Sequence, residues 1–277
     1  MRLYGWVGAI IIFVDFLIGI FKIQFLNIWI TPIFWIGYIL FMDALNLKLF
    51  GKSFLNLNKE GFLWLVIFSC PLWVIFEYYN VNINAWEYVG LPSFPLTVLG
   101  MFISFSTIWP AEFETAFFVK HIFNIENVNV KSCQITLSKI LFLIGIGVIC
   151  LVLPIFIRVP HICGLIWLGF ILVLDPLNFF LKLPSLLGER HQGKISNFLS
   201  FLVGGYICGF LWEFWNHFAG AKWIYHVPFL PHIRIFEMPV LGFLGFGPFG
   251  LEVFCMYYTC WFIFKRLRVI SSEYLRI

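Results

Sequence analysis

A twelve-residue pattern occurs twice in the chain and decides the fold. Trp35-Ile-Gly-Tyr-Ile-Leu-Phe-Met-Asp43-Ala-Leu-Asn46 aligns with Trp167-Leu-Gly-Phe-Ile-Leu-Val-Leu-Asp175-Pro-Leu-Asn178 at a constant offset of 132 residues. Self-similarity at a fixed spacing indicates two copies of one structural unit in a single chain.

Further matches follow this pattern in the same order, with a slowly drifting offset. They are Phe76-Glu77-Tyr78-Tyr79-Asn80 with Trp212-Glu213-Phe214-Trp215-Asn216, Trp86-Glu87-Tyr88 with Trp223-Ile224-Tyr225, and Pro110 and Glu114 with Pro248 and Glu252. Chance does not easily produce several ordered matches. We therefore predict two units, residues 1–131 and 132–277, and expect the second to be the active half.

The composition places both units in a membrane. Of the 277 residues, 61% are hydrophobic and 12% charged, whereas soluble domains carry about a quarter charged residues. This excludes a soluble globular protein, a disordered chain and a nucleic-acid binder. Apolar runs long enough to cross a bilayer lie at roughly 4–21, 28–46, 61–80, 97–119, 137–157, 162–181, 197–218 and 239–264.

The predicted fold is an all-α polytopic membrane protein of about eight transmembrane helices, built as two parallel four-helix repeats. An even number of spans per unit gives both units the same orientation. Of the eighteen Lys and Arg residues, fourteen fall on the side of the two termini. The positive-inside rule therefore predicts cytoplasmic termini, in the cell or inner membrane. The first run lacks a cleavage site and is expected to be retained.

The sequence offers little sign of a metal or cofactor. The seven cysteines form no CxxC pair and are expected to pack as small apolar residues. The histidines of the second unit match no ligand spacing, and no nucleotide-binding glycine motif follows a strand. We predict no metal and no cofactor.

Acidic residues inside the predicted spans point to chemistry. Eight occur, with no Lys or Arg well inside any span: Asp15, Asp43, Glu77, Glu112, Glu114, Asp175, Glu213 and Glu252. Intramembrane acids are costly and commonly functional. Without a cationic partner, some are expected to keep their proton, and a neutral carboxyl group in an apolar pocket is a proton donor. The candidate catalytic residues are Glu77, Glu114, Glu213 and Glu252.

Position along each span separates these acids. Asp43 with Asn46, and Asp175 with Asn178, lie three residues apart at span ends, so each pair shares a helix face and is expected to organise the adjoining loop. Glu114 and Glu252 each follow a proline by four residues. A proline kink there could open a cavity or could serve packing alone.

The surroundings of Glu213 are rich in polar and aromatic side chains. The candidate substrate-binding residues are Trp212, Trp215, Asn216, His217, Trp223, Tyr225 and Glu237. We predict that Glu213 and Glu252 face one cavity with Trp212, Trp223 and Tyr225. The same Trp, Tyr and His residues are also typical of an aromatic belt at a membrane interface.

Glu77 with Trp86-Glu87-Tyr88 and Pro110-Ala111-Glu112, and Glu213 with Trp223-Ile224-Tyr225, resemble elements of membrane-integral carotenoid (lycopene) cyclases and related transmembrane terpene cyclases. Those enzymes also consist of duplicated helical units, usually with fewer helices each. The resemblance implies that a neutral acid protonates an isoprenoid double bond, that aromatic faces stabilise the carbocation, and that a carboxylate or water removes a proton. No redox cofactor is required.

Three functions remain open from the sequence. The first is a membrane-embedded enzyme acting on a lipophilic substrate by proton donation, an isomerase of the cyclase type in carotenoid biosynthesis. The second is a proton-coupled transporter or lipid-handling carrier, which also uses duplicated units and intramembrane acids. The third is a non-catalytic subunit of a membrane complex. The expected partner is a membrane lipid or lipophilic small molecule, in a protein that forms homo- or hetero-oligomers or acts alone.

Overall fold

The computed structural model describes residues 1–226, 228, 230–270 and 273–276. Within them, eight helical segments are long and apolar enough to span a membrane, which confirms the predicted all-α polytopic fold. The first unit contains α1 (Leu3–Phe21), α3 (Ile30–Phe50), α5 (Lys59–Ile83) and α6 (Phe94–Ile122). The second contains α7 (Leu137–Phe156), α8 (Gly164–Phe180), α10 (Ser196–Phe218) and α11 (Phe246–Arg266).

Short elements connect the spans. They are the helices α2 (Gln24–Asn27), α4 (Phe54–Leu57) and α9 (Leu186–His191), the 3-10 turns Ile125–Asn127, Pro160–Ile162 and Val240–Gly245, and the strands β1 (Trp86–Val89), β2 (Lys222–Tyr225), β3 (Arg234–Ile235) and β4 (Met238–Pro239). Ser53 caps α4 and Ser185 caps α9, each by accepting a backbone N–H from the first turn. The two units therefore begin these short helices in the same way.

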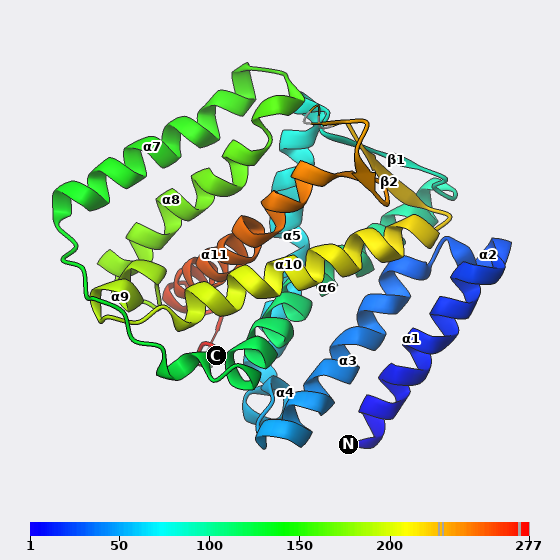
Figure 1. Cartoon of the computed structure of the whole chain (residues 1–277), viewed down its shortest axis with the longest axis horizontal. Coiled ribbons are helices and arrows are strands. Elements are labelled where there is room, and N and C mark those ends of the chain that lie inside the picture. Colours follow the sequence, from blue (N-terminus) through cyan, green and yellow to red (C-terminus); the bar gives the residue numbers. More distant parts are fainter. Residues whose placement is uncertain (227, 229, 271–272, 277) are drawn as a thin grey trace.

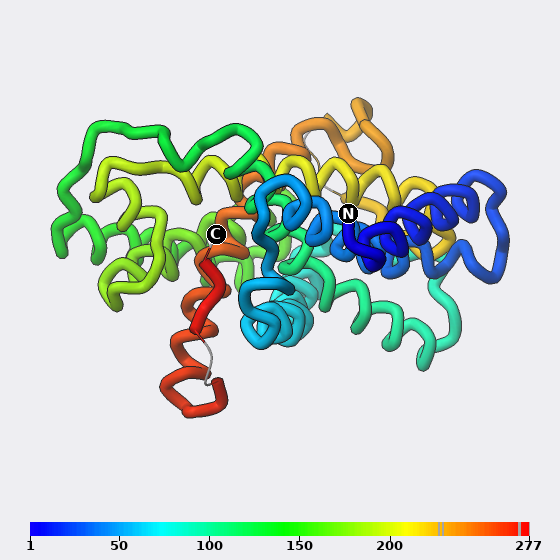
Figure 2. The backbone as a smooth tube through the Cα atoms, turned by 90° about the horizontal axis from the view of Figure 1, so that it is seen from below, coloured from blue at the N-terminus to red at the C-terminus, as the bar shows by residue number. Residues whose placement is uncertain are grey.

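Corresponding helices pack in corresponding ways. In the first unit α1 packs on α3, α3 on α6 and α5 on α6, as α7, α8, α10 and α11 do in the second. The pairs α1/α3 and α7/α8 lie on opposite sides of a centre made of α5, α6, α10 and α11 (Figure 1). The view from below places them at the two ends of the molecule (Figure 2). Both termini lie at the same end, away from β1 and β2 (Figure 1).

Paired glycines set the close approach of the outer helices in both units. A Cβ on Gly8 of α1 would lie 2.5 Å from the carbonyl oxygen of Gly37 in α3. A Cβ on Gly147 of α7 would lie 2.9 Å from the carbonyl oxygen of Gly169 in α8. Because such small residues let backbones touch, the repeat extends to the first helix of each unit.

Strands β1 and β2 record the symmetry between the units. They pair antiparallel, with Trp86 opposite Tyr225, Tyr88 opposite Trp223 and Glu87 opposite Ile224. The tryptophan of each unit therefore lies opposite the tyrosine of the other unit. A local two-fold axis passing between the strands produces this register.

The paired aspartates and asparagines hold the helix ends opposite these strands. Asp43 accepts the backbone N–H of Leu55, and Asp175 accepts those of Leu186 and Leu187. Each aspartate therefore ties the short helix that follows it to its own span.

The asparagines of these pairs reach the fourth span of their own unit. The side-chain N–H groups of Asn46 bond the backbone and carboxyl oxygens of Glu114, and those of Asn178 bond the carbonyl of Cys255. Cys255, and not Glu252, therefore occupies the place of Glu114 in the second unit. The 3-10 turn Val240–Gly245 comes directly before α11. It makes the offset between matching residues of the two units larger in α11 than the sequence match predicted.

Candidate functional site

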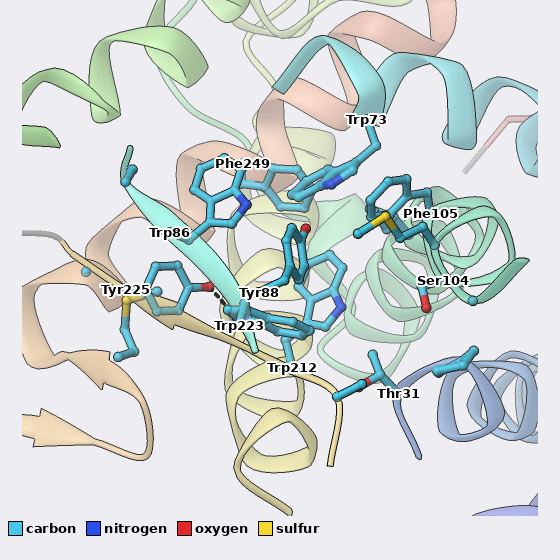
Figure 3. A pocket seen from close by; sticks show the side chains of 18 of the residues that line it. Thr31, Trp73, Trp86, Tyr88, Ser104, Phe105, Trp212, Trp223, Tyr225 and Phe249 are labelled. Carbon is cyan, nitrogen blue, oxygen red and sulfur yellow. Dashed lines mark hydrogen bonds between the residues drawn. The ribbon is translucent and has the colours of Figure 1, made fainter. Parts of the chain in front are cut away.

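A cavity of about 300 Å³ lies between the two units, at the end away from the termini. Helices α3, α5, α6, α8, α10 and α11 line it together with β1 and β2. The side chains around it are mainly aromatic, as Figure 3 shows for Trp73, Trp86, Tyr88, Phe105, Trp212, Trp223, Tyr225 and Phe249. Concave sites of this apolar character suit lipophilic ligands held by a few polar groups.

In each unit, one glutamate lies behind the aromatic side chains that line the cavity. In the first unit, Oε1 of Glu77 accepts a hydrogen bond from the Tyr88 hydroxyl at 2.6 Å and from Nε1 of Trp73 at 3.0 Å. Both donors line the cavity. The carboxyl group is thus connected to the cavity through a tyrosine and a tryptophan.

The second unit has a similar arrangement, in which the tryptophan donor comes from β2 and not from the helix of the glutamate. Oε1 of Glu213 accepts from the Tyr225 hydroxyl at 2.9 Å and from Nε1 of Trp223 at 3.3 Å. The Trp223 N–H also lies 2.8 Å from the Tyr225 oxygen. Glu213 is fully buried, and its other oxygen has no hydrogen-bond partner among the described residues. We call Tyr88 with Glu77, and Tyr225 with Glu213, the two Tyr–Glu pairs.

In each unit, the asparagine three residues after the glutamate positions the tyrosine of the Tyr–Glu pair. Asn80 accepts the backbone N–H of Trp86 at 3.1 Å and donates to its carbonyl at 2.8 Å. Asn216 makes the same two bonds to Trp223, at 3.0 and 2.8 Å. Because side chains two residues apart in a strand share a face, fixing the tryptophan also directs the tyrosine toward the glutamate.

Both tyrosines are expected to remain protonated. Burial raises the pKa of Tyr88 well above its usual value, and the nearby carboxyl of Glu77 adds to this. Burial and Glu213 raise the pKa of Tyr225 in the same way. The phenols therefore act as hydrogen-bond donors at neutral pH.

None of the eight acids in the spans forms an ion pair among the described residues. The ion pairs found there join Glu126 to Lys120 and His121, Glu237 to Lys222 and His217, and Glu87 to His226. The acids of the spans thus have no cationic partner within the described chain, as the sequence predicted.

The structure divides the predicted substrate-binding residues into three groups. Trp212, Trp223 and Tyr225 line the cavity. Trp215 lies in the core, where its ring stacks on Phe34 with centroids 4.1 Å apart, and Asn216 holds the backbone of β2. His217 and Glu237 do not line the cavity within the described chain and instead form an ion-paired group with Lys222.

We predicted that Glu252 faces the same cavity as Glu213, but it is absent from the described lining. It is fully buried, and neither carboxyl oxygen has a partner among the described residues. Phe249 lines the cavity, whereas Glu252, about one turn further along α11, is absent from the described lining. Pro248 falls in the first turn of α11, where proline is tolerated without a kink. Pro110 does lie inside a helix, and Glu114 below it bonds Asn46.

The first unit contributes more to the site than the sequence analysis expected. Trp73, Tyr88 and Phe105 line the cavity beside the residues of the second unit, so the site belongs to both halves. The repeat contained the signal for Tyr88, which matches Tyr225. Trp73 precedes Glu77 by four residues, a spacing that places two side chains on one helix face.

Glu237, Lys222 and His217 form an ion-paired group near the start of β2. This group predicts that the stability of the folded protein decreases in acid. Burial by itself raises the pKa of Glu237, but the hydrogen bond and charge of Lys222, followed by those of His217, outweigh it and hold the pKa below its usual value. A carboxyl group with a pKa depressed on folding stabilises the protein above its unfolded pKa, and this stabilisation is lost as pH falls through the folded pKa.

Thermal unfolding measured below and above pH 4.5 should therefore show a loss of stability in acid, part of which disappears in Glu237→Gln. Lys222→Met is the matched control, since it removes the other partner and should flatten the profile similarly. Identical acid profiles in the wild type and both variants would contradict this assignment.

The site thus combines an aromatic cavity with two protonated phenols, each backed by a glutamate without a cationic partner. Such a site can bind an apolar molecule, donate a proton to it and stabilise positive charge on it. No protein-family model, curated protein or solved structure matches this chain.

Proposed function

We propose that this protein is a membrane-embedded isomerase of the cyclase type that acts on a lipophilic, isoprenoid- or carotenoid-like substrate by proton donation. The observation that carries the proposal is the presence of two Tyr–Glu pairs against one aromatic cavity. The sequence resemblance to membrane-integral carotenoid and terpene cyclases supports the same reaction class.

The Tyr225–Glu213 pair supplies the proton in this proposal. For the reaction, the hydroxyl hydrogen of Tyr225 turns from Glu213 toward the substrate, and the protonated carboxyl group of Glu213 donates to the phenol oxygen in return. The Tyr225 O–H bond then breaks as its hydrogen forms a C–H bond with one carbon of a substrate double bond, and the proton of Glu213 moves to the phenol oxygen and leaves a carboxylate. The alkene π electrons form the new C–H bond and leave a carbocation on the other carbon. Full burial of Glu213 without a cation favours the neutral acid before the reaction.

Ring closure and proton loss complete the reaction. A second double bond attacks the carbocation to form a C–C bond, and loss of a proton from the neighbouring carbon restores a double bond. The Tyr88–Glu77 pair is the proposed acceptor, because Glu77 is only half-buried and can exchange protons with water. Substrate and product are then isomers, and exchange with solvent resets both pairs.

The aromatic lining has a role in each step. Trp73, Trp212 and Trp223 line the cavity. The faces of such rings carry negative electron density, which attracts a cation without reacting with it. Exclusion of water protects a carbocation from hydration. We assign the cavity to the outer half of the cell or inner membrane and both termini to the cytoplasm, since basic residues concentrate beside the termini.

A proton-coupled carrier is the second candidate, favoured by polar groups below the cavity. Trp212 lines the cavity, and Cys208 lies one turn deeper in α10. Its Sγ is 3.2 Å from the Thr115 hydroxyl, which is 2.7 Å from the Tyr38 hydroxyl. These buried groups extend toward the end that carries the termini, as a proton path would.

One experiment separates the two functions. The purified protein, reconstituted in lipid nanodiscs, is incubated in D₂O with linear isoprenoids such as squalene and geranylgeraniol, and the extract is analysed by mass spectrometry. An isomerase yields a product that carries one solvent deuterium. Absence of any isomer, together with proton movement driven by the lipophile in proteoliposomes, would replace the enzyme with the carrier.

A further inference from the structure

Two hydroxyl groups of the cavity have no partner in the described chain. Thr31, at the start of α3, lines the cavity, is 7% exposed, and its Oγ1 makes no hydrogen bond to a described residue. Ser104 of α6 also lines the cavity, and no hydrogen bond to a described residue involves its hydroxyl. The Thr31 hydroxyl is buried, whereas Ser104 is partly exposed. Leaving the buried Thr31 hydroxyl unpaired costs free energy, so a ligand that pairs it gains affinity.

Other hydroxyls nearby are satisfied inside the protein. Thr97 also lines the cavity, but its hydroxyl donates to the carbonyl of Pro92. Ser106, two residues from Ser104, donates to the carbonyl of Phe102 in its own helix. Serine in a helix commonly makes such a bond. Its absence at Ser104 leaves that hydroxyl free to bond a ligand.

These two residues lie on the same side of the cavity. Figure 3 shows Thr31 and Ser104 across Trp212 from Tyr225. A ligand bound there would extend its apolar body along the Trp212 ring toward the Tyr–Glu pairs. The described lining contains one histidine, His161, and no Asp, Glu, Lys or Arg, so the site offers no permanently charged side chain to bind a diphosphate or carboxylate group.

We propose that Thr31 and Ser104 form a polar subsite that binds a neutral hydroxyl or carbonyl group at one end of an otherwise apolar substrate. The inference rests on the proposed function, since it names the substrate class of the same cavity: an isoprenoid-like alcohol or ketone, and neither a pure hydrocarbon nor a diphosphate ester. A hydroxyl group can both donate to and accept from the two side chains.

Binding to the full-length protein in nanodiscs tests this subsite. The quenching of tryptophan fluorescence is measured with geranylgeraniol, with the hydrocarbon of the same carbon skeleton, and with geranylgeranyl diphosphate. The wild type should bind the alcohol roughly fivefold to tenfold more tightly than the hydrocarbon, as expected from one or two hydrogen bonds. The diphosphate should bind more weakly than the alcohol.

The variant Thr31→Val with Ser104→Ala should bind the alcohol and the hydrocarbon equally, because it removes both hydroxyls and keeps the cavity nearly the same size. Ser106→Ala is the matched control and should keep the preference for the alcohol. Equal affinities in the wild type, a preference that survives in the double variant, or tightest binding of the diphosphate would each overturn the subsite.

The outcome is separable from that of the proposed function, because the readout is binding and not turnover. If the alcohol preference depends on both hydroxyls but no isomer forms, the cyclase assignment fails and the subsite stands. If isomers form from the hydrocarbon with no preference for the alcohol, the subsite fails and the cyclase assignment stands.

Discussion

Glu213→Gln should lower the rate of product formation in D₂O by at least about 100-fold, which is the contribution typical of a general acid. Glutamine keeps the oxygen that accepts from Tyr225 and Trp223, so the geometry of the pair is retained. It cannot supply a proton to the Tyr225 oxygen. The loss should therefore appear in turnover, with little change in the fluorescence-detected affinity for geranylgeraniol.

Glu252→Gln is the matched control for this prediction. Glu252 is as fully buried as Glu213, and its carboxyl oxygens have no partner among the described residues. It is absent from the described lining of the cavity, so turnover should stay close to that of the wild type. Unchanged turnover in Glu213→Gln would remove Glu213 from the mechanism. Equal losses in both variants would point to a structural cause.

Gly205→Ala should destabilise the folded protein by about 3 kcal/mol, the upper part of the range for overpacking a tight interior. A Cβ at Gly205 of α10 would collide with the backbone carbonyl of Phe246 and lie 3.1 Å from the backbone nitrogen of Gly250 in α11. Neither backbone group can rotate away as a side chain can. The two helices must therefore separate, which moves Glu213 relative to Phe249.

Thermal unfolding in detergent measures this effect. Gly145→Ala in α7 is the matched control, since a Cβ there meets no atom within 4 Å. Alanine is the better helix former, so this variant should be as stable as the wild type or slightly more stable. If Gly205→Ala unfolds at the wild-type temperature, then α10 and α11 are not packed as closely as described.

The spans could be predicted from the sequence because crossing a bilayer requires a long apolar run whatever the neighbouring helices do. The predicted run 28–46 became α3 (Ile30–Phe50) and the run 197–218 became α10 (Ser196–Phe218). The strands could not be predicted in this way. β1 and β2 are four residues each and lie more than 130 residues apart, so their pairing is a contact between the two units.

The sequence by itself determined a membrane protein of eight spans, made of two copies of one unit, with acids in the spans and no basic residue to neutralise them. Only the tertiary structure decided that the cavity lies between the copies, that Glu77 and Glu213 reach it through tyrosines, and that Glu252 is absent from its described lining. The physical reason is that hydropathy depends on each residue alone. The direction of a side chain depends on how its helix is rotated against partners distant in the chain.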